Sequence, residues 1–370
     1  MSAIATNKRL DYLDNLKWVL IFMVIAHHTC IAFGGPGGGG YYWVPASSKL
    51  SKEVFLVYLT FQQSFFMTLF FAISSYFLLP ALLKKGNKVF LIDRLKRLGI
   101  PLLFMVLVFV PIMNLWREYL YAEPLHFSIN LLDVDQLWFV RTLLIFTVFF
   151  LIYHRVFAAK KDVQHSVDRP LTHKRILSFI ILLTVVQIVA MYTIPMIMSP
   201  HTLGIVMPFF SASGLPDMMI YIFFFGLGIK AWKENWLASL TVKIALPWFA
   251  GAVVVFVAAV IFHVFGYDHV ATVIINVVGR PLICSGICLF LIVLFKTCFN
   301  KHSWLTKNLA LAAYTAYILQ RPFITAATLI VAKLHLGSIT SFFIAAVIAI
   351  VSTFFVSHFI RQLPVLRKIL

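Results

Sequence analysis

Ten long apolar stretches divide this sequence from end to end, and they constrain its fold more than any other feature. A helix needs roughly 20 mostly apolar residues to cross a bilayer. The stretches lie at about 16–33, 54–83, 100–116, 137–157, 176–196, 217–232, 243–265, 270–297, 308–332 and 338–360. We therefore expect an all-α, polytopic transmembrane helix bundle of about ten helices, forming one integral membrane domain over residues 1–370.

The small share of charged residues excludes a water-soluble fold. Asp, Glu, Lys and Arg make up only 12% of the chain, whereas hydrophobic residues make up 61%. A soluble domain carries about 25% charged residues. Lipid must therefore face much of this protein.

The basic residues predict how the bundle is oriented. The formal net charge is +18, and Lys and Arg concentrate in cytoplasmic loops of membrane proteins. With the N-terminus inside, the basic segments 84–97 and 155–175 both become cytoplasmic. Four of the Lys and Arg residues then lie outside, namely Lys49, Lys52, Arg117 and Lys333. We expect both termini in the cytoplasm, and we assign the positive charge to topology rather than to nucleic acid binding.

The cysteines give no metal site and no disulfide framework. All four lie in or beside apolar stretches. Cys284 and Cys288 share a helix face, but no His or carboxylate stands near them in the sequence to complete a metal-ligand set. The expected metal content is none.

The first apolar stretch carries ionisable residues on one face, and such residues in a bilayer are functional candidates. At about 100° per residue, the step from Lys17 to His28 returns to within about 20° of its start, and the rise is about 16 Å. Asp14 lies on nearly the same face, and His27 lies roughly 80° away. A near-neutral imidazole can take a proton from an attacking hydroxyl. The alternative is that Lys17 and Asp14 form a topology pair and that His28 makes an interhelical hydrogen bond.

Several motifs together resemble the acyltransferase 3 family of integral membrane acyltransferases, and the stand-alone branch similar to glucan-modifying succinyltransferases is closest. That family has an Arg, ten residues and then a His in its first helix; here Lys17 replaces the Arg, which loses the planar guanidinium fork. The other matching segments are 71–77 (Phe-Ala-Ile-Ser-Ser-Tyr-Phe), 90–101 with Arg94, Arg97 and Pro101, 137–139 (Leu-Trp-Phe) and 313–320, which ends in Gln320 where His is common.

The resemblance implies an acyl-CoA-dependent O-acyltransferase that modifies an extracytoplasmic glycan, for example by O-acetylation of a polysaccharide. The donor would be acetyl-CoA or succinyl-CoA, with no tightly bound cofactor. The expected catalytic residues are His28 as general base, with Lys17 and Asp14. Positively charged residues suited to the phosphates of the donor are Lys85, Arg94, Lys96 and Arg97. Candidate acceptor-binding residues are Trp138, Arg141, Tyr314, Tyr317, Gln320 and Arg321.

The resemblance also implies a multi-pass protein of the plasma (inner) membrane of a bacterium. Its expected partners are membrane lipids, acyl-CoA, a carbohydrate acceptor and a second copy of the chain. Two interpretations stay open at this point. The basic segment 84–97 suits phosphate binding but also satisfies the positive-inside pattern. Intramembrane charges would equally line the path of a proton-coupled transporter or flippase.

Overall fold

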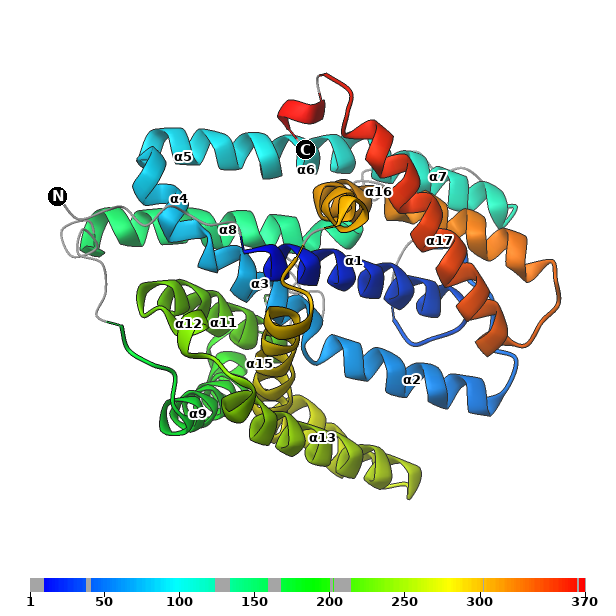
Figure 1. The fold of residues 1–370 in the computed structure, drawn as a ribbon. Helices are drawn as coiled ribbons and strands as arrows, with labels where there is room; N and C mark the ends of the chain where they lie inside the picture. Colours follow the sequence, from blue (N-terminus) through cyan, green and yellow to red (C-terminus); the bar gives the residue numbers. More distant parts are fainter. Residues whose placement is uncertain are drawn as a thin grey trace.

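The chain folds into a bundle of helices (Figure 1). The computed structural model describes residues 10–37, 41–123, 134–158, 168–199, 202, 214–301, 303–364 and 366–369. Within these ranges there are helices and turns but no strand, and nine helical segments are long and apolar enough to cross a membrane. They are Asp11–Ala32, Lys49–Lys85, Asn87–Leu120, Asp135–Phe157, His173–Ile197, Val242–Val264, Arg280–Cys298, Trp304–Ala332 and Ser338–Ile360. The prediction of an all-α polytopic transmembrane bundle is confirmed.

The stretch expected at 217–232 is also a helix, although it is not among these nine. This is α11 (Leu215–Lys233), which packs against α3 (Phe66–Tyr76) and α9 (His173–Ile197). Gly228 permits the close contact with α3, because a Cβ atom there would lie 2.2 Å from the carbonyl oxygen of Ala72. The sixth expected stretch is therefore an integral part of the bundle.

The first helix, α1 (Asp11–Ala32), lies in the middle of the bundle (Figure 1). It packs against α15 (Arg280–Cys298), α16 (Trp304–Ala332) and α17 (Ser338–Ile360). Asp11 and Asp14 in its first turn stabilise the helix, because negative charge interacts favourably with the positive end of the helix dipole. Asn15 fixes this end, since its amide donates to the carbonyl oxygens of Phe299 at 2.8 Å and Lys301 at 3.0 Å.

The second and third spans are each built from consecutive helices rather than one straight rod. The second contains α2 (Lys49–Gln63), α3 and α4 (Leu78–Lys85). After a turn at Gly86, the third runs through α5 (Asn87–Arg94), α6 (Ile100–Phe104) and α7 (Val110–Leu120), joined by π-helical turns. The basic segment 84–97, expected as a loop, is thus mostly helical. At 34 residues, and with a rise of about 1.5 Å per residue, this span is longer than the hydrocarbon core is thick.

The fourth span contains α8 (Trp138–Tyr153). The fifth is α9, and the loop after α11 holds the short α12 (Trp236–Ser239). Next, α13 (Val242–Val264) packs along α15. The stretch expected as one helix at 270–297 is divided, because α14 (Asp268–Val273) and a π-helical turn end at Gly279 before α15 begins at Arg280. Pro281 in the first turn of α15 suits a helix start, since its missing N–H would have no helical partner there.

Candidate functional site

Two histidines, His27 and His28, lie near the C-terminal end of α1. We call this the histidine end of the bundle. The ring of His28 stacks on Tyr41 with 5.1 Å between centroids, and it meets the ring of His27 edge-on at 5.5 Å. The Nδ1 atom of His28 is buried and has no hydrogen-bond partner among the described residues. The residue as a whole is partly exposed. His28 is therefore an imidazole held by stacking, with one buried ring nitrogen that forms no hydrogen bond within the described part of the chain.

His27 is held differently, by a hydrogen bond. Its Nδ1 atom lies 3.2 Å from Oε1 of Gln62, whose amide nitrogen donates to the hydroxyl of Tyr58 at 2.8 Å. An amide oxygen can only accept, so Nδ1 of His27 must carry the proton of this bond. The contact fixes the orientation and the tautomer of His27. Gln62 is 3% exposed, and the sequence reasoning did not single it out.

Behind Tyr41 lies a buried network that links segments far apart in the chain. The Tyr41 hydroxyl donates to Oε1 of Gln136 at 2.8 Å, and the Gln136 amide donates to the carbonyl oxygen of Ile318 at 3.0 Å. The hydroxyl of Tyr317 donates to the backbone oxygen of Gln136. Burial, and then the nearby charge of Asp135, raises the pKa of Tyr41 well above its usual value, so its hydroxyl remains protonated and able to donate. This network positions the aromatic ring on which His28 stacks.

Arg321, a candidate acceptor-binding residue, lies wholly inside this network. Its guanidinium pairs with the Asp135 carboxylate at 2.9 Å and donates to Oδ1 of Asn114 at 2.6 Å. Asp135 has a left-handed backbone with φ of 42°, which directs the chain into α8. Gln320 is also fully buried; its amide donates to the Tyr317 carbonyl oxygen at 3.1 Å, and its Oε1 has no hydrogen-bond partner within the described part of the chain. Tyr317, Gln320 and Arg321 are therefore brought together.

The other three candidate acceptor-binding residues lie elsewhere. The Tyr314 hydroxyl donates to the backbone oxygen of Arg97 at 2.8 Å, so Tyr314 contacts the basic segment. Trp138 packs against Tyr221 with 5.6 Å between ring centroids. Arg141 follows Trp138 by one turn of α8.

At the opposite end of α1, which we call the lysine end, Lys17 pairs with Asp14 at 3.2 Å, the contact that the alternative interpretation of the sequence expected. The Lys17 ammonium also lies 4.6 Å from the centre of the Phe77 ring. About a third of the Lys17 side chain is exposed. The cation is anchored but still accessible to a ligand from outside the bundle.

The basic segment presents its cations at the surface. Lys96 and Arg97 are exposed, while Lys85 forms an ion pair with Asp93 at 2.5 Å. The Arg94 guanidinium lies over the ring of Phe90, 5.0 Å from its centre. Lys85 ends α4, whereas Arg94, Lys96 and Arg97 follow the turn at Gly86, and Arg97 contacts α16 through Tyr314.

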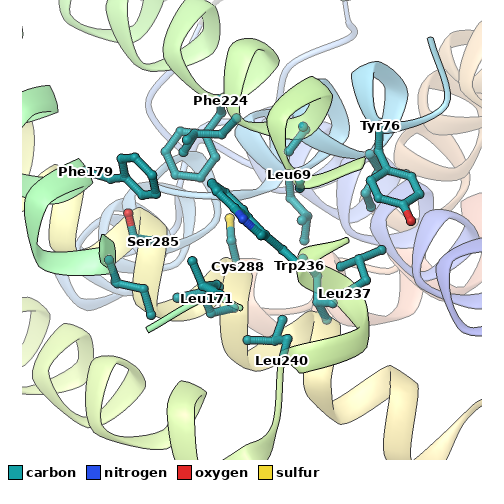
Figure 2. A pocket seen from close by; sticks show the side chains of 18 of the residues that line it. Leu69, Tyr76, Leu171, Phe179, Phe224, Trp236, Leu237, Leu240, Ser285 and Cys288 are labelled. Atoms are coloured by element: carbon teal, nitrogen blue, oxygen red, sulfur yellow. The ribbon is translucent and has the colours of Figure 1, made fainter. Parts of the chain in front are cut away.

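A second buried ion pair and an apolar pocket were not expected. Arg280 pairs with Asp217, and both side chains are almost completely buried. Figure 2 shows the pocket, in which the Trp236 indole lies among Phe179, Phe224 and Leu69. Its lining is overwhelmingly apolar, so it suits hydrocarbon rather than charged groups. No group of three or more His, Cys, Asp or Glu side chains among the described residues could hold a metal ion.

Comparison with known proteins identifies the family. A family model described as an acyltransferase domain, acyltransferase 3, matches residues 10–360. No match was found among curated proteins or among solved structures. The match extends over nearly the whole chain, from the start of α1 to the end of α17. The chain belongs to the acyltransferase 3 family, and it is a multi-pass membrane acyltransferase.

Proposed function

We propose that this protein is an O-acyltransferase that moves an acyl group from cytoplasmic acyl-CoA to a hydroxyl of an extracytoplasmic glycan. The observation that carries the proposal is the arrangement along α1. An accessible cation, Lys17, stands at one end, and a histidine with unused hydrogen-bonding capacity, His28, stands about 16 Å further along nearly the same face.

The donor side of the proposal uses the lysine end, and the distribution of basic residues supports a cytoplasmic location for it. Lys17 and the exposed cations Lys96 and Arg97 suit the phosphates of a nucleotide donor such as acetyl-CoA or succinyl-CoA. Arg94 and Lys85 belong to the same segment. A pantetheine arm that follows α1 would bring the thioester toward His28.

The chemical step needs a base at the histidine end. In the proposed reaction His28 accepts the proton of the acceptor hydroxyl while the hydroxyl oxygen attacks the thioester carbonyl carbon. The tetrahedral intermediate then collapses, the carbon–sulfur bond breaks, and the imidazolium returns the proton to the leaving thiolate. The products are an ester and free CoA thiol. Tyr41, fixed by Gln136, holds the His28 ring for this role.

The proposed location is the plasma membrane of a bacterium, as the family resemblance implies. The distribution of Lys and Arg supports two cytoplasmic termini.

Tyr317, Gln320 and Arg321 form bonds within the protein, so we assign them to the support of the site rather than to direct contact with the glycan.

The test is thiol release from acyl-CoA and acyl transfer to gluco-oligosaccharides by purified protein in nanodiscs. We expect His28→Ala to lower kcat about 10²–10⁴-fold, the usual contribution of a positioned general base. His27→Ala, a neighbouring imidazole with its own partner, is the matched comparison and should lose less. Wild-type turnover by His28→Ala would refute the assignment of the base. Proton-coupled uptake into vesicles without acyl turnover would instead favour a transporter.

A further inference from the structure

A groove between α2 and α13 contains polar groups to which the proposed mechanism assigns no role. It is about 870 Å³ in volume, and its lining includes Glu53, Tyr58, Phe256, His263 and Asp268. A smaller hollow of about 290 Å³ shares four of its lining residues and adds the polar side chains of Thr60 and Asn276. The lining residues of the groove come mainly from α2, from α13 and from the start of α14; Figure 1 shows α13 below α2.

Three lining residues of the groove are tied together, because one histidine lies between two carboxylates. Nε2 of His263 lies 2.8 Å from Oε2 of Glu53, and its Nδ1 lies 2.5 Å from Oδ1 of Asp268. These contacts link the start of α2, the end of α13 and the start of α14. The walls are therefore positioned before any ligand arrives, which lowers the entropic cost of binding.

The two carboxylates keep capacity for a ligand. The Glu53 side chain is 43% exposed and that of Asp268 is 70% exposed, and His263 engages only one oxygen of each. A carboxylate has about four acceptor positions, so the second oxygen of each can accept from hydroxyl groups. The lining also includes the aromatic side chains of Tyr58, Phe61 and Phe256. Carboxylates and aromatic rings in one groove suit a ligand that is rich in hydroxyl groups and has apolar C–H faces.

The charged side chains of the groove have both signs. Glu53 and Asp268 are acidic, whereas Lys49 is basic and His263 lies between the two carboxylates. A lining of mixed charge gives no preference for an anionic lipid headgroup, so the choice of a carbohydrate depends on the carboxylate acceptors and the aromatic rings.

A chain of hydrogen bonds connects the groove to the histidine pair. Tyr58 lines the groove, its hydroxyl accepts from Gln62, and Gln62 accepts from His27, whose ring touches that of His28. One lining residue of the groove, Tyr58, is thus two hydrogen bonds away from His27. By the distribution of charge, Lys49 and Glu53 also belong to the extracytoplasmic side.

We infer that the groove between α2 and α13 is the binding site of the glycan acceptor, with Glu53 and Asp268 accepting from its hydroxyls and Tyr58 and Phe256 packing on its sugar rings. That the bound glycan is the acceptor of acyl transfer rests on the proposed function. Carbohydrate binding in the groove does not depend on it.

The experiment is direct binding of short linear gluco-oligosaccharides to full-length protein in nanodiscs, without acyl donor. We expect Glu53→Gln and Asp268→Asn each to weaken binding about tenfold, because each removes a charged acceptor of hydrogen bonds. Glu123→Gln, an exposed acid outside the groove, is the matched control and should bind as wild type does. Val57→Trp fills the groove without touching the His263 contacts and should abolish binding.

Equal binding by wild type, Val57→Trp and the two acid variants would overturn the inference, and so would the absence of binding by wild type. Thermal unfolding midpoints identify any variant that fails to fold. Acyl transfer is measured separately on the same samples. Binding that depends on the groove but leads to no acyl turnover would refute the proposed function and leave the carbohydrate site standing. Acyl transfer with unchanged acceptor KM in all three variants would refute the site alone.

Discussion

Removing one charge from the buried Arg321–Asp135 pair should destabilise the bundle strongly, and by an amount that depends on which partner is removed. The Arg321 side chain is 1% exposed, and that of Asp135 is 11% exposed. Deleting one member of such a buried pair costs about 3–5 kcal/mol, because the remaining charge loses its partner in a low-dielectric interior.

The two single variants are not equivalent, since the remaining groups differ chemically. After Arg321→Met, the Asp135 carboxyl can bind a proton and become neutral. After Asp135→Asn, the Arg321 guanidinium cannot lose its charge, although Asn114 still accepts one of its hydrogen bonds. We therefore expect Asp135→Asn to lie at the upper end of the 3–5 kcal/mol range and Arg321→Met at the lower end. The double variant should be more stable than Asp135→Asn alone.

The assay is thermal unfolding of the purified variants in nanodiscs, followed by tryptophan fluorescence at two pH values. The Arg321→Met variant should gain stability as the pH falls, because a protonated carboxyl relieves its unpaired charge, whereas Asp135→Asn should not. Asp93→Asn, which breaks the exposed pair with Lys85, is the control and should change the midpoint little. Equal losses in both single variants, or losses that add in the double variant, would refute this reasoning.

Three further changes test other contacts of the site and the bundle. Tyr41→Phe keeps the ring under His28 but removes the hydroxyl that donates to Gln136 Oε1. We expect kcat/KM for acyl transfer to fall about five- to tenfold, because the net loss of one hydrogen bond is about 1 kcal/mol. Tyr42→Phe is the control, and an unchanged kcat/KM in Tyr41→Phe would contradict the positioning role. Gly228→Ala should destabilise the protein by at least 1–3 kcal/mol in thermal unfolding, since its Cβ would meet both the Ala72 carbonyl and the Ser75 hydroxyl; relief of all of this loss by Ser75→Ala would show that the backbone contact is unimportant. Lys17→Met should raise the KM for acyl-CoA more than it lowers kcat, and Lys17→Arg should restore it; an unchanged KM in Lys17→Met would remove the cation from the donor site.

Most of the fold follows from the length of the apolar stretches, because a membrane span needs little more than length and low charge. The boundaries that were missed have a common reason. The π-helical turn ends at Gly279 and α15 begins at Arg280 inside a stretch that stays mostly apolar on both sides, so average hydropathy does not show the break. Likewise the basic segment 84–97 continues as helix after the single turn at Gly86, whose φ of 73° suits glycine.

The candidate site divides in the same way between local and long-range information. The Lys17–Asp14 pair depends only on the geometry of one helix and could be predicted from spacing. The surroundings of His28 could not, because Tyr41 reaches Gln136 across 95 positions and Tyr317 reaches it across 181. Tyr314 shows the limit most clearly. It stands three residues before Tyr317 on the same helix, yet its hydroxyl contacts Arg97 rather than the network behind His28. Residues of one sequence motif can therefore belong to different sites, because the segments packed against α16 decide what each side chain contacts.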